Sequence, residues 1–145
     1  MLYVVTGPPA SGKSSWITAH ATPRDIVIDL DRIAVALTGP GAPQWNHDAI
    51  VQRVAQRARF AAIDEAVKHL DEVDVYLIHT MPGPKARARY RRLGARIVVV
   101  DPGEETVRER VRAMRSPAMD RVVTRWYREY RAAGPAPTRQ ASRQW

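Results

Sequence analysis

The chain has 145 residues, and its 23 Lys and Arg residues against 15 Asp and Glu residues give a formal charge of +8 at pH 7. This length predicts one domain with a buried core. The absence of cysteine excludes disulfides, thiolate zinc sites and a cysteine nucleophile, and no apolar run is long enough to span a membrane. Since the chain begins with a strand-like segment rather than a signal peptide, we expect a soluble, cytoplasmic protein.

The first predicted strand leads into a phosphate-binding loop. Residues 2–6 are apolar and β-branched, and the following segment matches the pattern G-x-x-x-x-G-K-[ST], with a helix predicted from Ser15 to Ala21. This context predicts a site for ATP or another nucleoside triphosphate. Lys13 should contact the β- and γ-phosphates, and Ser14 should bind Mg²⁺. The predicted nucleotide-binding residues are Gly7, Pro8, Pro9, Ala10, Ser11, Gly12, Lys13, Ser14 and Ser15.

Two carboxylates follow the second predicted strand, residues 26–28. In phosphoryl transfer, one carboxylate must orient and deprotonate the attacking hydroxyl. We favour Asp31 as this base because Asp29 is nearer the sheet, where it could support Mg²⁺. Alternatively, one or both side chains cap the short helix predicted at residues 33–37.

A long helix is predicted after a loop rich in glycine and proline at residues 38–45. The loop could cover a site or simply lie on the surface. Asn46 or His47 could cap the helix, which should extend to about Leu70, and Arg53 and Arg57 share a face that we expect to be solvated. Its predicted apolar stripe consists of Ile50, Val54, Ala58, Ala61, Ala62, Val67 and Leu70.

The third predicted strand, residues 73–78, ends at His79. This imidazole could bond a substrate hydroxyl or phosphate, although a lone histidine more often has a structural role. A turn then leads into a strongly basic helix from Lys85 to Leu93. We expect Arg32, His79 and this helix to line an acceptor channel, because the ends of the second and third strands should flank the first strand. A basic face exposed to water explains the charge equally well.

A helix rich in arginine follows the fourth predicted strand, residues 95–100. Asp101 resembles the N-cap of this helix more than a metal-binding aspartate. The helix should reach about Met114 and stop before Ser116-Pro117. Such a basic helix end before a break suits a lid that stabilises the charge on a transferring phosphoryl group, although some of the arginines must simply be solvated.

The order of elements predicts an α/β fold of the P-loop NTPase type, with a parallel sheet of about four strands sandwiched by helices. After a last helix at about residues 119–130, the domain should end, so we expect a kinase domain at 1–131 and a flexible tail at 132–145. From residue 105 onward, ten arginines against four acidic residues give a net charge of +6. This excess suggests a polyanionic ligand, either nucleotide or nucleic acid, although a solvated surface would also carry it.

The segment 7–16 resembles the phosphate loop of the bacteriophage 5′-hydroxyl polynucleotide kinases. The similarity continues along nearly the whole chain to the segment 126–130, which is similar to the closing helix of that family. The resemblance implies a kinase that uses ATP and Mg²⁺ to phosphorylate the 5′ end of a nucleic acid. It implies that Asp31 is the general base and that Arg110 and Arg115 are arginines of the lid.

Two departures from this family concern the acceptor. An arginine that binds the 3′-phosphate of the substrate is replaced by Ala34, while Arg32 adjoins the base, and an aspartate after the third strand is replaced by His79. We therefore expect transfer from ATP to a hydroxyl, with the 5′-hydroxyl of a polynucleotide as the favoured acceptor. A kinase acting on a nucleoside, sugar or antibiotic, and a nucleotide-gated ATPase that binds nucleic acid, are the alternatives.

Overall fold

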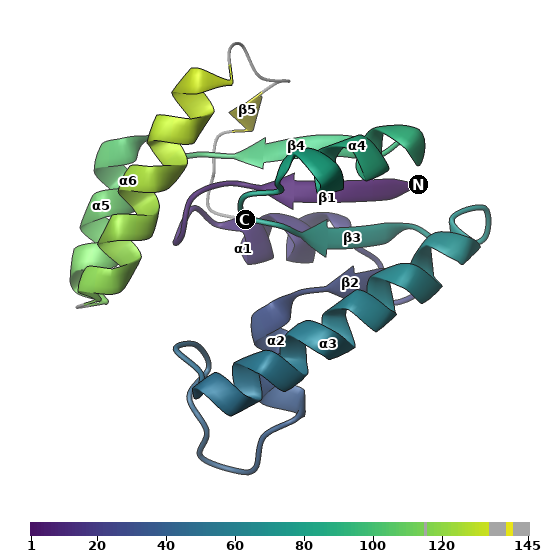
Figure 1. The fold of residues 1–145 in the computed structure, drawn as a ribbon, viewed down its shortest axis with the longest axis horizontal. Helices are drawn as coiled ribbons and strands as arrows, with labels where there is room; N and C mark the ends of the chain where they lie inside the picture. The colour runs from purple at the N-terminus through teal and green to yellow at the C-terminus, as the bar shows by residue number, and fades with distance from the viewer. Residues whose placement is uncertain (115, 134–138, 141–145) are drawn as a thin grey trace.

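Five parallel strands form one sheet in the order β2-β3-β1-β4-β5 in the computed structural model, which describes residues 1–114, 116–133 and 139–140 (Figure 1). The predicted α/β fold is confirmed. The fifth strand is an addition to the four predicted ones: Arg139 and Gln140, in the predicted tail, pair with Val99 and Val100. The strands are β1 (Leu2–Thr6), β2 (Ile26–Ile28), β3 (Val75–Ile78), β4 (Arg96–Val100) and β5 (Arg139–Gln140).

Helices cover the sheet and close its carboxyl edge (Figure 1). They are α1 (Lys13–His20), α2 (Leu30–Ala36), α3 (Ala49–Ala66), which the 3₁₀ turn η1 (Val67–His69) continues, α4 (Pro84–Arg92), α5 (Glu104–Ala113) and α6 (Pro117–Ala132). Within the described ranges, no helix combines the length and the apolar character that crossing a membrane requires.

The strand order differs from one expectation. We expected β2 and β3 to flank β1, but Val4 on β1 pairs with Leu77 on β3 and with Ile97 on β4, so β3 and β4 flank it. The strand β2 pairs with β3, where Ile28 is opposite Leu77. The chain therefore crosses over through α2 and α3 and inserts β3 between β2 and β1, which moves the predicted base one strand away from the phosphate loop.

Alternating side chains of the central strands build two apolar layers. Leu2 and Val4 of β1 pack with Ile63 of α3 and Tyr90 of α4 on one face. On the opposite face, Val5 packs with buried Trp16 and Ile17 of α1. A third cluster joins Val99 of β4 to α5 and α6. These layers fix the phosphate loop and the ends of all central strands at one edge of the sheet.

The predicted apolar stripe of α3 is wrong for its first half. Ile50 is 74% exposed and Val54 is 51% exposed. The buried face instead consists of Ala55, Arg59, Ile63 and Ala66. The amino-terminal turns of α3 extend past the sheet and lie beside α2, so only the later turns reach the apolar layer (Figure 1). The pattern of apolar residues does not reveal this, because the sequence does not say where the helix leaves the sheet.

Candidate active site

The loop between β1 and α1 is folded around its own lysine. The Lys13 ammonium donates hydrogen bonds to the carbonyls of Gly7 (3.0 Å) and Pro8 (2.7 Å). Gly7 has a φ of 148°, and a Cβ there would lie 2.2 Å from the Val100 carbonyl oxygen. Any larger residue would push the loop away from β4. The loop thus has the close backbone approach that a phosphate cradle needs.

The charge of Lys13 depends on its surroundings. Burial of the ammonium inside the loop lowers the pKa of Lys13 to about 8, although Asp29 and Asp31 both oppose this shift. Bound phosphate groups would favour the protonated form and raise this pKa again. Nucleotide binding and proton uptake by Lys13 should therefore be coupled.

We expect the affinity for ATP to be constant below pH 8 and to fall above it, by about tenfold per pH unit, because the free lysine then loses a proton that the complex retains. Titration of a fluorescent ATP analogue between pH values of about 7 and 9.5 measures this. Lys13→Arg is the control, since a guanidinium stays charged throughout this range and should remove the decline. An affinity that stays flat to the upper limit in the unchanged protein would contradict the coupling.

Asp29 joins the end of β2 to the phosphate loop. Its Oδ1 accepts the backbone N–H of Asp31 (3.1 Å) as the N-cap of α2, and its Oδ2 lies 3.5 Å from the Ser14 hydroxyl. Burial raises the pKa of Asp29. A hydroxyl and a carboxylate at this distance are the hard oxygen donors that Mg²⁺ takes together with substrate phosphates, so these two side chains fit the ion. The predicted capping role holds for Asp29 rather than for Asp31.

Asp31 points away from the cap and meets a histidine that the sequence analysis considered only as a helix cap. Its Oδ1 lies 2.8 Å from Nε2 of His47, whose side chain is only 5% exposed, while the Asp31 side chain is 57% exposed. His47 follows the loop predicted at residues 38–45 and does not cap α3, whose N-cap is Asp48. No sequence spacing relates the two residues, because the pairing depends on how α3 packs against α2.

The helices α5 and α6 lie beyond the carboxyl edge of the sheet (Figure 1). From α5, the guanidinium of Arg110, a predicted lid arginine, donates to the carbonyl of Ala10 in the phosphate loop (3.0 Å). Arg115, the second predicted lid arginine, lies outside the described residues. Arg108 instead binds Glu104 and Asp120, which ties α5 to α6.

We expected Asp101 to cap α5, but it does not. The N-cap is Gly103, which adopts a φ of 108° and delays the start of the helix. The buried Asp101 carboxylate accepts hydrogen bonds from the Gly103 backbone N–H (2.9 Å) and the Tyr127 hydroxyl (2.6 Å). It therefore connects the end of β4 to α6.

The predicted substrate residues lie at different places. Arg32 is exposed beside Asp31 on α2, and Lys85 is exposed at the start of α4. His79 follows β3, and its Nδ1 lies 2.7 Å from the Tyr90 hydroxyl. Burial, together with the Arg59 guanidinium, lowers the pKa of His79 to about 4, so this imidazole is neutral at pH 7.

Arg59 is a feature that the sequence analysis missed. This arginine of α3 is only 7% exposed and donates to the Ile78 carbonyl at the end of β3 (3.0 Å). Burial lowers the pKa of Arg59, while Tyr90 and Asp29 oppose the shift. Its position on the buried face of α3 was hidden because arginine is usually found at the surface.

A glycine-containing phosphate loop between a parallel strand and α1, with Lys13 at its end and carboxylates at the end of β2, defines a P-loop domain. Residues 2–133 match the family model AAA_33, described as an AAA domain, and the chain belongs to this family. A crystal structure of a putative kinase from Chloroflexus aurantiacus J-10-fl has a similar fold, with a TM-score of 0.58 and 19% sequence identity over 92% of this chain and 97% of that one. A search of the curated proteins finds no match.

Proposed function

We propose that this protein transfers the γ-phosphate of ATP to a hydroxyl group and that the preferred acceptor is the 5′-hydroxyl of a polynucleotide. The convergence of Lys13, Ser14, Asp29 and Asp31 at one sheet edge supports this proposal most directly. These groups supply a phosphate-binding cation, oxygen donors for Mg²⁺ and a separate carboxylate. A protein that only bound nucleotides would not need the exposed Asp31.

In the proposed reaction, Asp31 accepts the proton of the acceptor hydroxyl as its oxygen forms a bond to the γ-phosphorus and the bond to the β-phosphate oxygen breaks. ADP leaves with the electron pair of that bond. Lys13 and Arg110 would stabilise the charge on the phosphate oxygens. Bound Mg²⁺, held by Ser14 with Asp29 nearby, would neutralise phosphate charge. His47 keeps the Asp31 carboxylate oriented through one oxygen, which leaves the other for the substrate.

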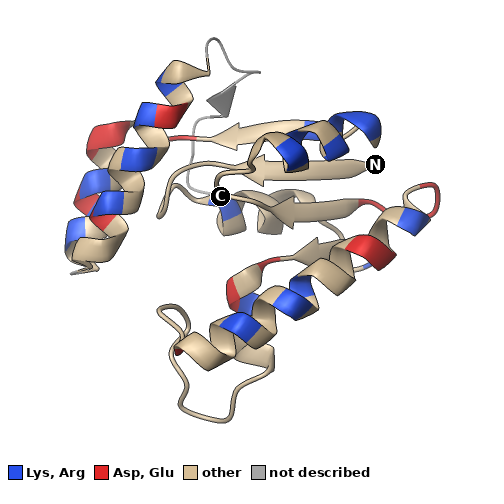
Figure 2. Ribbon diagram, viewed as in Figure 1, with Lys and Arg blue, Asp and Glu red and all other residues tan. Residues whose placement is uncertain are grey.

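The choice of acceptor is supported by charge. Lys and Arg residues gather on α4, whereas basic and acidic residues both occur on α5 and α6 (Figure 2). The helix α4 has five basic residues and no acidic one. A polyanionic acceptor suits this helix. Arg32 and His79 are proposed to contact the 5′ end of the polynucleotide near Asp31. A small-molecule acceptor is the second candidate, because Ala34 and His79 replace two charged residues with which the similar polynucleotide kinases face their acceptor.

We expect γ-labelled ATP to transfer its label to single-stranded oligonucleotides that carry a 5′-hydroxyl, and not to the same oligonucleotides carrying a 5′-phosphate. The assay should include nucleosides, sugars and aminoglycosides at equal concentration. Label on a small alcohol alone would establish the second candidate. If ATP were hydrolysed to ADP and phosphate and no acceptor became labelled, the protein would instead be a nucleotide-gated ATPase that binds nucleic acid.

A further inference from the structure

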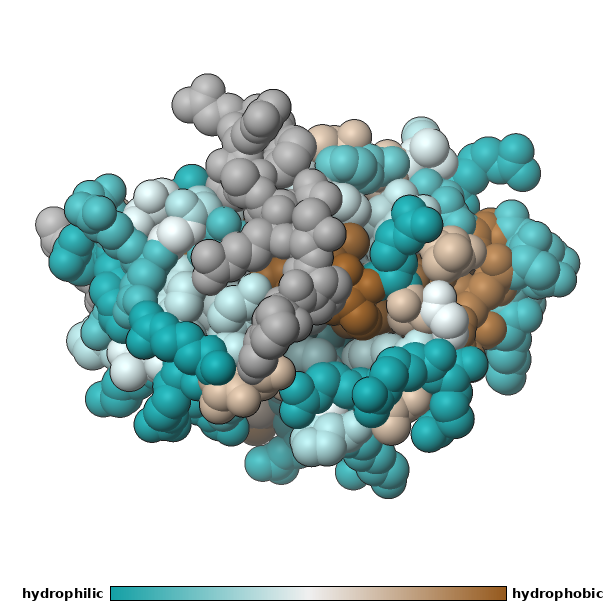
Figure 3. All heavy atoms as spheres, turned by 90° about the horizontal axis from the view of Figure 1, so that it is seen from above, coloured by the Kyte–Doolittle hydropathy of each residue, from teal (hydrophilic) through white to brown (hydrophobic). Residues whose placement is uncertain are grey.

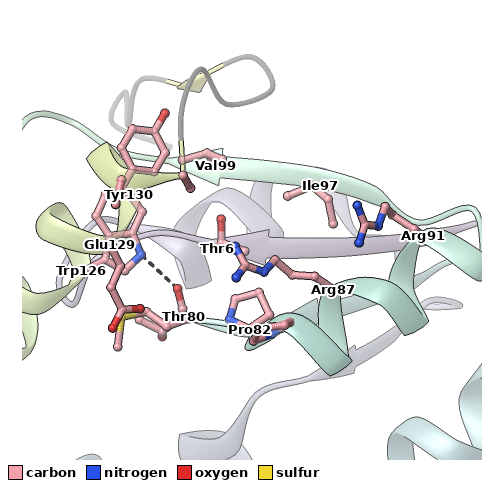
Figure 4. Close-up of a pocket in the computed structure, with 14 residues that line it drawn as sticks. Thr6, Thr80, Pro82, Arg87, Arg91, Ile97, Val99, Trp126, Glu129 and Tyr130 are labelled. Atoms are coloured by element: carbon pink, nitrogen blue, oxygen red, sulfur yellow. Dashed lines mark hydrogen bonds between the residues drawn. The ribbon is translucent and has the colours of Figure 1, made fainter.

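A cavity of about 850 Å³ lies between α4 and α6, over the end of the sheet (Figure 4). Thr6 of β1 and Ile97 and Val99 of β4 line its floor, on the face opposite α1. Thr80, just past β3, lines its inner end. Because Thr6 immediately precedes Gly7, the cavity begins where the phosphate loop begins. Residues 7–14 of the phosphate loop, Asp29 and Asp31 are not among its lining residues.

Two guanidinium groups form one wall. Arg87 and Arg91 are four residues apart on α4, so both line the same side, about 6 Å apart along the helix axis. Among the described residues, no carboxylate lies within ion-pair distance of either one, whereas Arg89 between them points elsewhere and binds Asp64. Glu129, the one carboxylate among the described lining residues, already pairs with Arg125. This wall is therefore suited to an anion.

The opposite wall is aromatic. The rings of Trp126 and Tyr130 on α6 are stacked, with centroids 4.8 Å apart and planes within 12°. The Trp126 indole N–H donates to the Thr80 carbonyl (3.0 Å), which fixes this wall to the end of β3. Viewed from above, apolar surface is exposed between hydrophilic side chains (Figure 3). An apolar floor, an aromatic wall and a cationic wall are together suited to a nucleotide, whose base has flat faces that stack on such surfaces and whose phosphate is charged.

We propose that this cavity binds the acceptor strand next to its reacting end, with bases against the apolar and aromatic surfaces and backbone phosphates on Arg87 and Arg91. This inference rests on the proposed polynucleotide acceptor. In this arrangement the nucleic acid runs along the turn after β3 toward the neighbouring end of β2, which carries Asp31. Arg87 and Arg91, rather than the predicted Lys85, are then the phosphate contacts of α4, because Lys85 does not line the cavity.

The test measures binding of a fluorescein-labelled single-stranded oligodeoxynucleotide without ATP, over a series of salt concentrations. The double variant Arg87→Ala/Arg91→Ala should weaken binding by about tenfold or more. It should also flatten the slope of log K against log salt by about 1.4, the value for two phosphate contacts to a single strand. The control, Lys85→Ala/Arg92→Ala, removes the same charge from exposed positions of the same helix outside the cavity and should have a clearly smaller effect on both quantities.

Equal losses in both double variants would overturn the inference, because binding would then follow the overall charge of α4. So would an increase in the KM for ATP in the cavity variant alone, because the cavity would then belong to the phosphate donor. Failure of the proposed function has a different signature: the unchanged protein would bind the oligonucleotide but would not label it from ATP. Since all four positions are exposed, both variants should keep the melting temperature of the parent.

Discussion

Lys13→Ala should lower kcat for phosphoryl transfer by about 10³-fold or more. The lysine is the one side-chain cation of the phosphate loop, and its ammonium already lies against the carbonyls of Gly7 and Pro8. Its removal leaves several phosphate charges without a partner in a poorly solvated loop. Steady-state transfer from γ-labelled ATP to the best acceptor measures the loss.

Lys68→Ala is the matched control for this change. Lys68 is an exposed lysine of η1 that pairs only with Glu65 among the described residues, and its removal should leave kcat unchanged. Both variants require a melting curve, because Lys13 also joins two turns of its loop. Turnover close to that of the unchanged protein in a folded Lys13→Ala variant would remove the phosphate loop from the mechanism.

Asp31→Asn should lower kcat by about 10²-fold or more while the affinity for ATP changes little. Asparagine has nearly the same size and can still face His47, but it cannot accept the proton of the acceptor hydroxyl. The Asp31 carboxylate is exposed and faces His47 with only one of its oxygens, whereas Asp29 is buried and occupied as the cap of α2. Single-turnover measurements with saturating ATP separate the chemical step from product release.

Asp29→Asn is the comparison for this second change. Asparagine retains the helix cap, so α2 should stay in place, but the weaker oxygen donor beside Ser14 should raise the concentration of Mg²⁺ needed for half-maximal activity. The two aspartates are thus distinguished by the kind of defect. If Asp29→Asn abolished the chemical step and Asp31→Asn were nearly silent, the proposed roles would have to be exchanged.

Local sequence determined the architecture and the donor half of the site. The short β-branched runs separated by helical segments predicted the parallel sheet, because a strand and a helix have different apolar periods. The phosphate loop could be located because its chemistry depends on consecutive residues: glycines that permit the backbone path and a lysine at a fixed spacing. Asp29 and Asp31 could be selected as candidates because they directly follow a strand.

Tertiary structure alone decided which distant groups meet. The strand order placed β3 between β2 and β1, and the packing of α3 against α2 brought His47 to Asp31 and buried Arg59 behind His79. The helical period puts residues four apart, such as Arg87 and Arg91, on one side of a helix, but it cannot show that α6 lies opposite them with Trp126. Such pairings depend on the direction in which each helix leaves the sheet, and that direction is set by packing over the whole core rather than by any local pattern of residues.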